Sequence, residues 1–370
     1  MPDSRPDPAA SPRRHAWPAL FGIALIVAVV ALAFAWVAGW LTPGRLTPAR
    51  FTNAIETGNG EIHRGFRRAH AKGVCVAGYF EGNGQGVALS RARLFAPVRT
   101  PFVGRMSVGG GSPYGLDSKA RVRSMALELN SDDGQQWRMA MNSFPFFGVS
   151  SVQAFYEQTL ANAPDPATGK PDPARMAAFA QANPEFARFA AWAKSAPWST
   201  SWANTRYNGV NAFRFTNSAG KRHHVRWSMQ PQTPFAAMSP EQRAAADDNF
   251  LSEDLATRLA QGPLRWDMVV TLAAAGDPVN DASQPWPEDR AQVTVGTVVI
   301  ESTTPQTTGA CRDINYDPLV LPLGVEGSDD PVLAARSAVY SVSFNRREHD
   351  IATGKAAAAT GDAAPTEVTP

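Results

Sequence analysis

Residues 121–141 read RVRSMALELNSDDGQQWRMAM, and this stretch has the pattern of a β-hairpin. In its first half, alternate side chains share one face, namely Arg123, Met125, Leu127 and Leu129. The alternation returns in the second half at Trp137, Met139 and Met141. Asp133-Gly134 between the halves is a favoured pair for a tight turn. Because period-two alternation of apolar residues is typical of strands with one buried face, the stretch predicts two antiparallel strands.

The flanking sequence extends this β pattern and interrupts it with helices. A second hairpin is predicted over residues 212–227, and further strands over 74–80, 266–273 and 293–301. Helices are predicted over 173–182 and 184–194, with Asn183 as the N-cap of the second and Pro184 in its first turn. Antiparallel strand pairs with helices inserted between them in the sequence indicate an α+β fold, built on an antiparallel sheet or barrel.

Composition describes a globular protein and excludes some function classes. The chain has 370 residues, of which 44% are hydrophobic and 18% charged. Its net charge of +2 provides no general electrostatic surface for nucleic acid. The only two cysteines, Cys75 and Cys311, are too few for a four-cysteine zinc site, and neither lies in a CxxCH haem-attachment motif. A disulfide between them and two separate buried thiols both remain open.

The N-terminal region contains a membrane-spanning pattern. Residues 17–40 carry no charge and are long enough to cross about 30 Å of hydrocarbon as a helix. Arg13 and Arg14 precede this segment, so residues 1–16 are expected in the cytoplasm and the remainder across the membrane. We interpret 17–40 as a transmembrane anchor or uncleaved signal, with a cleaved signal as the alternative. Residues 41–351 are the expected folded body, and 352–370 form an Ala/Thr/Gly/Pro-rich tail that we predict to be disordered.

One motif carries a specific resemblance. Residues 67–73 read RRAHAKG, and residues 74–81 continue as the apolar run VCVAGYFE. This block resembles the distal-histidine segment of the haem catalases, in which R-x-x-H-A-[KR]-G leads into a strand ending G-Y-F-E. The resemblance implies that His70 is the distal catalytic histidine and that Arg67 contacts the haem.

Two further blocks follow the order of that family. Arg105-Met106-Ser107 resembles its R-F-S, which implies that Arg105 binds a haem propionate and that Ser107 orients His70. Residues 141–146, MNSFPF, resemble its N-N-T-P-x-F, which carries the distal asparagine. Aligned on Pro145 that position falls on Ser143, and Asn142 fits if the loop has one extra residue. We assign Asn142 and keep Ser143 as the alternative; Phe155 matches the haem-stacking phenylalanine.

The last block lies near the C-terminal end of the folded body. Asp317-Pro318 precedes a Leu/Val/Pro-rich stretch that leads to Arg336, Tyr340 and Arg347 in the spacing R-x-x-x-Y-x6-R. In the catalases the tyrosine of this motif is the proximal iron ligand. The resemblance therefore implies that Tyr340 is the metal ligand, that Arg336 contacts its phenolate and that Arg347 binds a haem propionate.

The resemblance spans residues 50–350 and implies a catalase-like antiparallel β-barrel with inserted helices, preceded by one transmembrane helix. We expect neither the longer N-terminal arm nor the C-terminal helical additions of the common catalases, so the chain looks like the small catalase-related peroxidases. The expected cofactor is noncovalent haem b. The expected activity is reduction of hydrogen peroxide or organic hydroperoxides with an organic electron donor; the alternatives are a true catalase and a membrane-attached haem-binding protein without turnover.

The implied residues suit that chemistry. Iron and a nearby arginine both favour the phenolate form of a tyrosine ligand. A histidine can move a proton from one peroxide oxygen to the other, and an asparagine donor can stabilise the charge that develops. The expected partners are hydrogen peroxide, a small organic donor and the membrane, with no nucleic acid. A homo-oligomer is compatible with the family, and the expected location is the cytoplasmic membrane, single-pass, with the catalytic domain in the periplasm.

Overall fold

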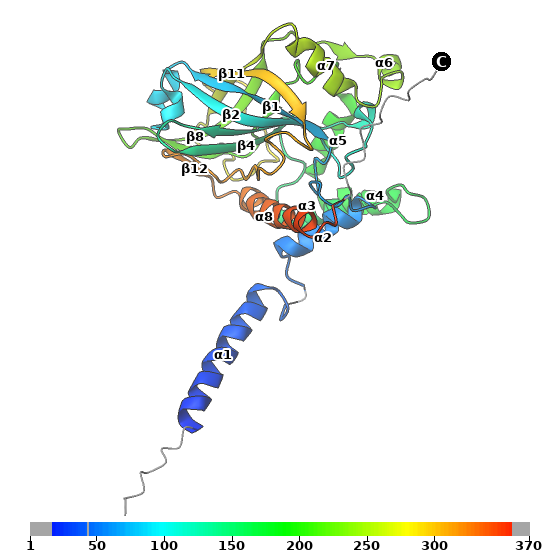
Figure 1. The fold of residues 1–370 in the computed structure, drawn as a ribbon, viewed down its shortest axis with the longest axis vertical. Helices are drawn as coiled ribbons and strands as arrows, with labels where there is room; N and C mark the ends of the chain where they lie inside the picture. Colours follow the sequence, from blue (N-terminus) through cyan, green and yellow to red (C-terminus); the bar gives the residue numbers. More distant parts are fainter. Residues whose placement is uncertain (1–16, 43, 357–370) are drawn as a thin grey trace, which may run out of the picture. The chain divides into compact units, whose positions relative to one another are not determined.

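The structure is a computed structural model that describes residues 17–42 and 44–356. The expected cytoplasmic segment 1–16 lies outside the described residues, as do residues 357–370 of the expected tail. The chain divides into a unit that ends at Thr47 and a second unit that begins at Pro48. We consider each unit by itself (Figure 1).

The first unit contains helix α1, Trp17–Val37. Its 21 residues are apolar throughout, and its length and composition suffice to cross a membrane. A signal sequence at the N-terminus has the same properties. The expectation of one membrane-spanning helix therefore agrees with the structure, which ends the helix at Val37.

The second unit is built around a closed antiparallel barrel (Figure 1). Within the described residues, eight strands follow one another in the order β10-β11-β1-β2-β3-β4-β6-β8, and pairing of β8 with β10 closes the ring. The short strands β7 and β12 extend the sheet beyond β8. The barrel strands are β1 (Gly73–Gly82), β2 (Arg99–Val108), β3 (Arg123–Asn130), β4 (Gln136–Asn142), β6 (Tyr207–Asn208), β8 (Arg222–Pro231), β10 (Leu264–Leu272) and β11 (Gln292–Pro305).

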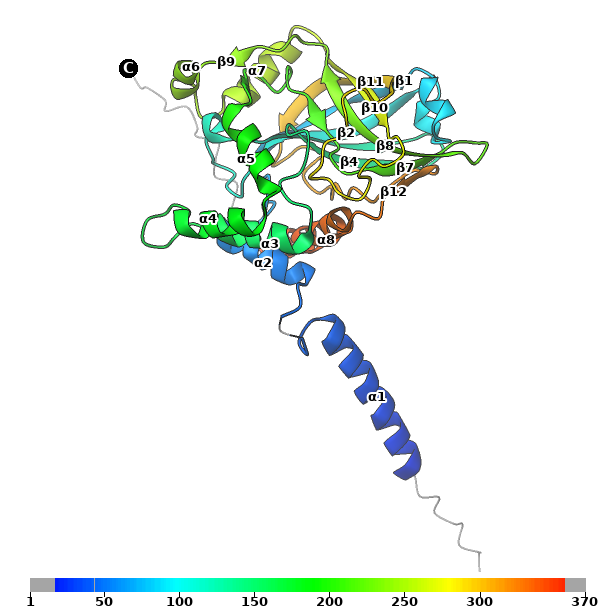
Figure 2. The same ribbon diagram turned by 180° about the vertical axis from the view of Figure 1, so that it is seen from behind.

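Short elements and helices connect these strands. The remaining strands are β5 (Trp198–Ser199) and β9 (Ala237–Met238), which pair with each other, β7 (Phe213–Thr216) and β12 (Val325–Gly327). The helices are α2 (Pro48–Gly58), α3 (Val152–Ala161), α4 (Pro173–Ala182), α5 (Phe186–Ser195), α6 (Pro240–Ala244), α7 (Phe250–Leu259) and α8 (Pro331–Ala352). Three 3-10 turns are η1 (Gln85–Ala88), η2 (Arg93–Phe95) and η3 (Asp117–Lys119). Helix α2 packs against α3 and α8 on one side of the barrel, as Figure 2 shows from behind.

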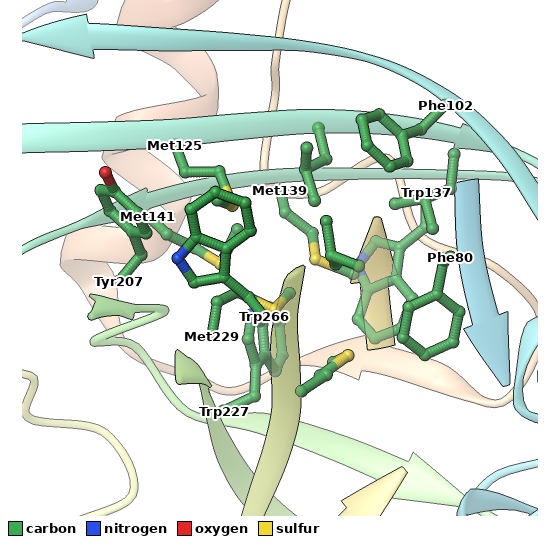
Figure 3. Packing of buried hydrophobic residues seen from close by; sticks show 14 of the residues in the cluster. Phe80, Phe102, Met125, Trp137, Met139, Met141, Tyr207, Trp227, Met229 and Trp266 are labelled. Carbon is green, nitrogen blue, oxygen red and sulfur yellow. The ribbon is translucent and has the colours of Figure 1, made fainter. Parts of the chain in front are cut away.

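The predicted hairpins form and supply the barrel core. In the first hairpin Met125 pairs with Met141 and Leu129 with Trp137, and all four side chains are buried. The second hairpin is β7-β8, and its inward residues include Trp227 (Figure 3). Side chains of alternate positions converge inside the barrel because successive residues of a strand point to opposite faces. The α+β fold expected from the sequence, an antiparallel barrel with inserted helices, is confirmed.

Two local interpretations differ from the structure. Asn183 does not cap the following helix: it ends α4, its side-chain amide donates to the Phe179 carbonyl at 3.0 Å, and α5 has Glu185 at its N-cap. Helix α4 instead begins after Asp172, whose carboxylate accepts from the Ala174 N–H. The long helix α8 was not predicted, and it carries the Arg336, Tyr340 and Arg347 motif.

Trp137 tests how much the barrel interior contributes to stability. Its ring is 1% exposed and lies 5.2 Å from the Trp227 ring, while its buried indole Nε1 has no hydrogen-bond partner among the described residues. We expect Trp137→Ala to lower the free energy of unfolding by about 3–5 kcal/mol because it leaves a cavity. Trp137→Phe keeps a ring and removes no hydrogen bond, so its effect should be much smaller. Urea unfolding measures both, and equal losses for the two variants would contradict this packing.

Candidate active site

A cavity of about 560 Å3 lies between the barrel wall and the helices that cover it. Strands β2, β3 and β4 line one side, and helices α2, α3 and α8 line the other. Every site residue expected from the sequence lines this one cavity: Arg67, His70, Arg105, Ser107, Asn142, Phe155, Arg336, Tyr340 and Arg347. Residues separated by up to 280 positions along the chain are thus brought together by the barrel and α8.

The barrel wall presents a row of small and polar residues to this cavity. Gly73 on β1 pairs with Ser107 on β2, Ser107 with Ser124 on β3, and Ser124 with Asn142 on β4. Directly opposed residues on neighbouring strands project from the same face of a sheet, which places these side chains in one line. A Cβ on Gly73 would lie 2.3 Å from the Met106 carbonyl oxygen, so only glycine allows the strands to approach this closely here.

His70 precedes the first barrel strand in an unusual backbone conformation. Its φ of 54° lies in the left-handed region, which a non-glycine residue rarely adopts. The two residues that follow His70 are anchored: the Ala71 N–H donates to the Gly110 carbonyl at 3.0 Å, and the Lys72 ammonium pairs with Asp117 at 2.9 Å. Such conformations cost about 1–3 kcal/mol and persist where the surroundings impose them, often at functional sites.

The imidazole of His70 contacts a serine, but not the serine expected from the sequence. Ser124 Oγ lies 3.1 Å from His70 Nδ1 and donates to Asn142 Oδ1 at 2.6 Å. Ser107 lines the same cavity, and among the described residues no hydrogen bond joins it to His70, so its role in orienting His70 stays a prediction. Ser143, the alternative to Asn142, does not line the cavity, and its hydroxyl accepts from the Arg123 N–H.

Burial and charge keep the imidazole neutral. The ring lies below the surface with one part facing the cavity, and this burial lowers the pKa of His70 from its ordinary 6.5 to about 4. The positive charges of Arg105, Arg336 and Arg67 lower the pKa further in the same direction. A neutral imidazole has one nitrogen with a free lone pair and can accept a proton.

Three arginines form a strongly positive part of the cavity. Arg67 donates to the carbonyls of Cys311 and Ile314, at 2.9 and 2.8 Å, and Arg105 donates to the Ala71 carbonyl and the Gln306 side chain. Burial, together with the neighbouring Arg105 and Arg347, holds the pKa of Arg67 well below its usual range. Burial likewise lowers the pKa of Arg105 to about 10.

These arginines lack a full complement of negative charge. In the described chain the hydrogen bonds of Arg67 and Arg105 go to neutral oxygens, and Arg105 Nε is buried without a partner. The pKa of Arg347 is also lowered by burial, although Glu348 lies 3.2 Å from it. Buried charges are normally paired, so this part of the cavity is suited to an anionic ligand with more than one carboxylate.

Helix α8 explains the spacing of the last motif. It begins after Asp330, whose carboxylate accepts from the Val332 N–H at 2.8 Å, with Pro331 in the first position. At 3.6 residues per turn, residues four and eleven positions apart lie on the same helix face. Arg336, Tyr340 and Arg347 therefore all face the cavity.

A hydrogen-bond chain fixes the arginine beside Tyr340. The guanidinium of Arg336 donates to the Tyr340 hydroxyl at 3.4 Å, to the Ala140 carbonyl at 2.9 Å and to Asn211 Oδ1 at 2.5 Å. Asn211 in turn donates to the Asp330 carboxylate at 2.8 Å. The preceding Val210 has a φ of 35°, an outlier for a β-branched residue, which shows that the local structure constrains this turn tightly. Sequence analysis did not identify Asn211 or Asp330.

Phenylalanines form the apolar wall of the cavity. Phe155 on α3 lies 4.9 Å from the ring of Phe51 on α2 and 4.8 Å from that of Phe147. Phe144 and Phe189 line the same cavity. A flat apolar ligand with charged groups at one edge would match this wall and the three arginines together.

A disulfide ties the strand after His70 to the segment that holds Arg67. Cys75 on β1 is bonded to Cys311, 236 residues away in the sequence. The carbonyl of Cys311 is one of the two that accept from Arg67. Of the two arrangements left open by the sequence, the structure therefore has the disulfide.

The comparisons with known proteins agree with this geometry. The catalase family model matches residues 64–349. The chain belongs to the catalase family. Membership identifies it as an oxidoreductase acting on hydrogen peroxide and implies a haem cofactor. The family expected from the sequence is confirmed.

Two small relatives match nearly their whole length. The chain is 39% identical over 334 residues to a catalase-related peroxidase of Synechococcus elongatus, covering 90% of this chain and 98% of the relative. It is 32% identical over 305 residues to a catalase-related peroxidase of Mycolicibacterium paratuberculosis, covering 82% and 96%. Catalase A from Saccharomyces cerevisiae shares the fold with a TM-score of 0.69 at 19% identity, over 76% of this chain. The chain spans only 61% of that larger catalase.

Proposed function

We propose that this catalase-family chain is a haem-dependent peroxidase that reduces hydrogen peroxide or organic hydroperoxides with an organic electron donor. His70 is the acid–base residue and Tyr340 the iron ligand. The observation that carries the proposal is the convergence on one cavity of a neutral imidazole, a phenol beside an arginine and three buried guanidinium groups. The two small relatives named catalase-related peroxidases support it.

The residues present fit haem b held without covalent bonds. Arg67, Arg105 and Arg347 would bind its two carboxylates, which is what the unpaired Arg105 Nε and the lowered arginine pKa values call for. Phe155 would contact the apolar macrocycle. Tyr340 would donate its oxygen to the iron, with Arg336 donating a hydrogen bond to the same oxygen. The bound haem supplies the redox chemistry of the reaction.

The protein side of the chemistry is proton movement. The neutral His70 can accept a proton from one peroxide oxygen and deliver it to the other, which makes that oxygen leave as water. Asn142 carries a side-chain N–H group that can stabilise the charge developing on the peroxide. The barrel wall holds the His70 imidazole and the Asn142 amide in position. They therefore need not rearrange when peroxide reacts, which favours the reaction.

Dismutation of hydrogen peroxide is the second candidate function. Asn142 lines the cavity, and its side-chain oxygen accepts a hydrogen bond from Ser124. The amide of an asparagine at this position can donate a hydrogen bond to bound peroxide, as dismutation would require. Oxygen release with and without an organic donor separates the two activities: a peroxidase consumes donor with little oxygen evolved.

The location we propose is the cytoplasmic membrane, single-pass, with the folded body in the periplasm. Helix α1 supplies a span of sufficient length. The disulfide between Cys75 and Cys311 supports the outer side, because disulfides persist in oxidising compartments.

Absorption spectra of purified protein test the ligand assignment. We expect wild-type protein to show a high-spin ferric haem band that is altered or lost in Tyr340→Phe. His70→Gln should keep the band, while its rate of reaction with peroxide falls about 100- to 10,000-fold, the usual contribution of an acid–base group. The exposed Tyr114→Phe is the matched control and should behave as wild type. Purified wild-type protein that cannot bind haem would overturn the proposal.

The rate of the peroxide reaction should depend on pH through His70. A lowered pKa means that the imidazole is neutral above the pKa and protonated, hence unable to accept a proton, below it. The rate should therefore be constant near neutral pH and fall with acidification, between the ordinary value of 6.5 and about 4. Carboxylates bound at Arg67 and Arg105 would move the midpoint upward within that range. His70→Gln should lose this dependence; the same inflection in that variant would assign it to another group.

Labelling in cells tests the proposed location. Because both cysteines are buried, the protein is denatured before labelling. A thiol reagent should then not label Cys75 or Cys311 until a reductant is added, because both sulfurs are in the disulfide. Protease added to spheroplasts should digest the folded body. Labelling without reductant, combined with protection from protease until the membrane is opened, would place the folded body in the cytoplasm instead.

A further inference from the structure

The hydroxyl of Ser124 lies between the two polar groups of the distal side. Ser124 is 6% exposed and sits on β3 directly opposite Asn142 on β4. Its Oγ is 2.6 Å from Asn142 Oδ1 and 3.1 Å from His70 Nδ1. One side chain therefore contacts both of the residues to which the proposed function assigns proton transfer and charge stabilisation.

The orientation of the Asn142 amide determines the direction of these bonds. A serine hydroxyl has one hydrogen to donate, and an amide oxygen can only accept. The short contact with Asn142 Oδ1 therefore uses the Ser124 hydrogen, which leaves its oxygen to accept from His70. With this orientation of the Asn142 amide, the hydrogen of the neutral imidazole lies on Nδ1 and Nε2 has the free lone pair. The imidazole also has a backbone hydrogen bond with Val108.

The same bond sets the orientation of the asparagine amide. With Oδ1 turned toward Ser124, the amide nitrogen of Asn142 points the other way. If the amide were reversed, its N–H would donate to Ser124, the serine would donate to Nδ1, and Nε2 would carry the proton. The imidazole tautomer and the amide orientation are thus linked through one hydroxyl.

We propose that Ser124 is a positioning residue that couples His70 to Asn142, so that a proton acceptor and an N–H donor are held in the cavity together. This inference rests on the proposed function of the site. It assigns to Ser124 the role that the family resemblance gave to Ser107, which faces Ser124 across β2 and β3.

Cyanide binding to the haem-loaded full chain tests the coupling without turnover. Hydrogen cyanide binds ferric iron as the anion, so its proton must be taken up by a base in the cavity, and the affinity reports on the lone pair of His70. We expect Ser124→Ala to weaken cyanide binding about tenfold, the effect of losing one hydrogen bond to a group that becomes charged. Ser124→Thr keeps the hydroxyl and should restore most of the affinity.

Control variants separate this role from a general loss of structure. Ser90 is fully buried and donates to the Gly324 carbonyl at 2.9 Å outside the cavity, so Ser90→Ala should leave cyanide affinity unchanged. In the background Asn142→Ala, the effect of Ser124→Ala should shrink, because coupled residues are not additive. This double-mutant cycle compares Ser124→Ala, Asn142→Ala and the double variant, so the test does not depend on one single variant that folds poorly.

The outcomes distinguish the inference from the proposed function. If Ser107→Ala weakens cyanide binding while Ser124→Ala does not, or if the two substitutions at Ser124 and Asn142 are additive, the coupling role of Ser124 is wrong and the haem site stands. If wild-type protein binds neither haem nor cyanide, the proposed function itself fails.

Discussion

Positive charge buried in the cavity is the constraint on which the site depends. Burial lowers the pKa values of Arg67, Arg105 and Arg347, and the charge of Arg347 lowers those of the first two further. Arg67 and Arg105 donate to neutral oxygens in the described chain. Burying such groups is costly unless an anion compensates them. A dicarboxylate cofactor would supply that anion, and it would be oriented by the same contacts. The contacts between the arginines and the carboxylates would then both compensate the buried charge and orient the cofactor.

The surrounding fold gives this cavity rigid walls. On one side the antiparallel barrel projects Ser107, Ser124 and Asn142 in one line. Across from it, α8 projects an arginine, a tyrosine and a second arginine from one face. Two loop residues of the cavity lining have a strained backbone. Among the described residues, His70 and Val210 are the non-glycine residues with positive φ, and both line the cavity. Strain stored at these positions is offset by the hydrogen bonds and ion pairs around them.

Local patterns explain why much of the fold could be predicted. The hairpin of β3 and β4 was recognisable because its apolar residues alternate and its turn carries Asp133-Gly134. Helix α8 was not, because its buried face includes Arg336, Arg347 and Asp350, which break the apolar period of a helix. Asn183 resembled an N-cap in sequence, but its side chain bonds backward to the preceding helix.

The site was predictable only where a family motif marks it. His70, Asn142 and Tyr340 stand in motifs, and the structure brings them to one cavity. Asn211 acts through a contact with Arg336, 125 residues away, which no local pattern encodes. Ser124 was accessible in principle, because the turn at Asp133-Gly134 sets the register that pairs it with Asn142. Pairing of Cys75 with Cys311 likewise depends on the closed barrel and the segment folded over it.

We propose that Tyr340 binds the iron of a haem whose carboxylates neutralise the buried arginines. Resonance Raman spectroscopy of the haem-loaded wild-type protein tests it most directly, because a phenolate bound to ferric iron has characteristic vibrations. We expect tyrosinate bands that shift when the tyrosines are isotopically labelled. A ferric haem spectrum with the vibrations of a histidine or thiolate ligand, and no tyrosinate bands, would contradict it.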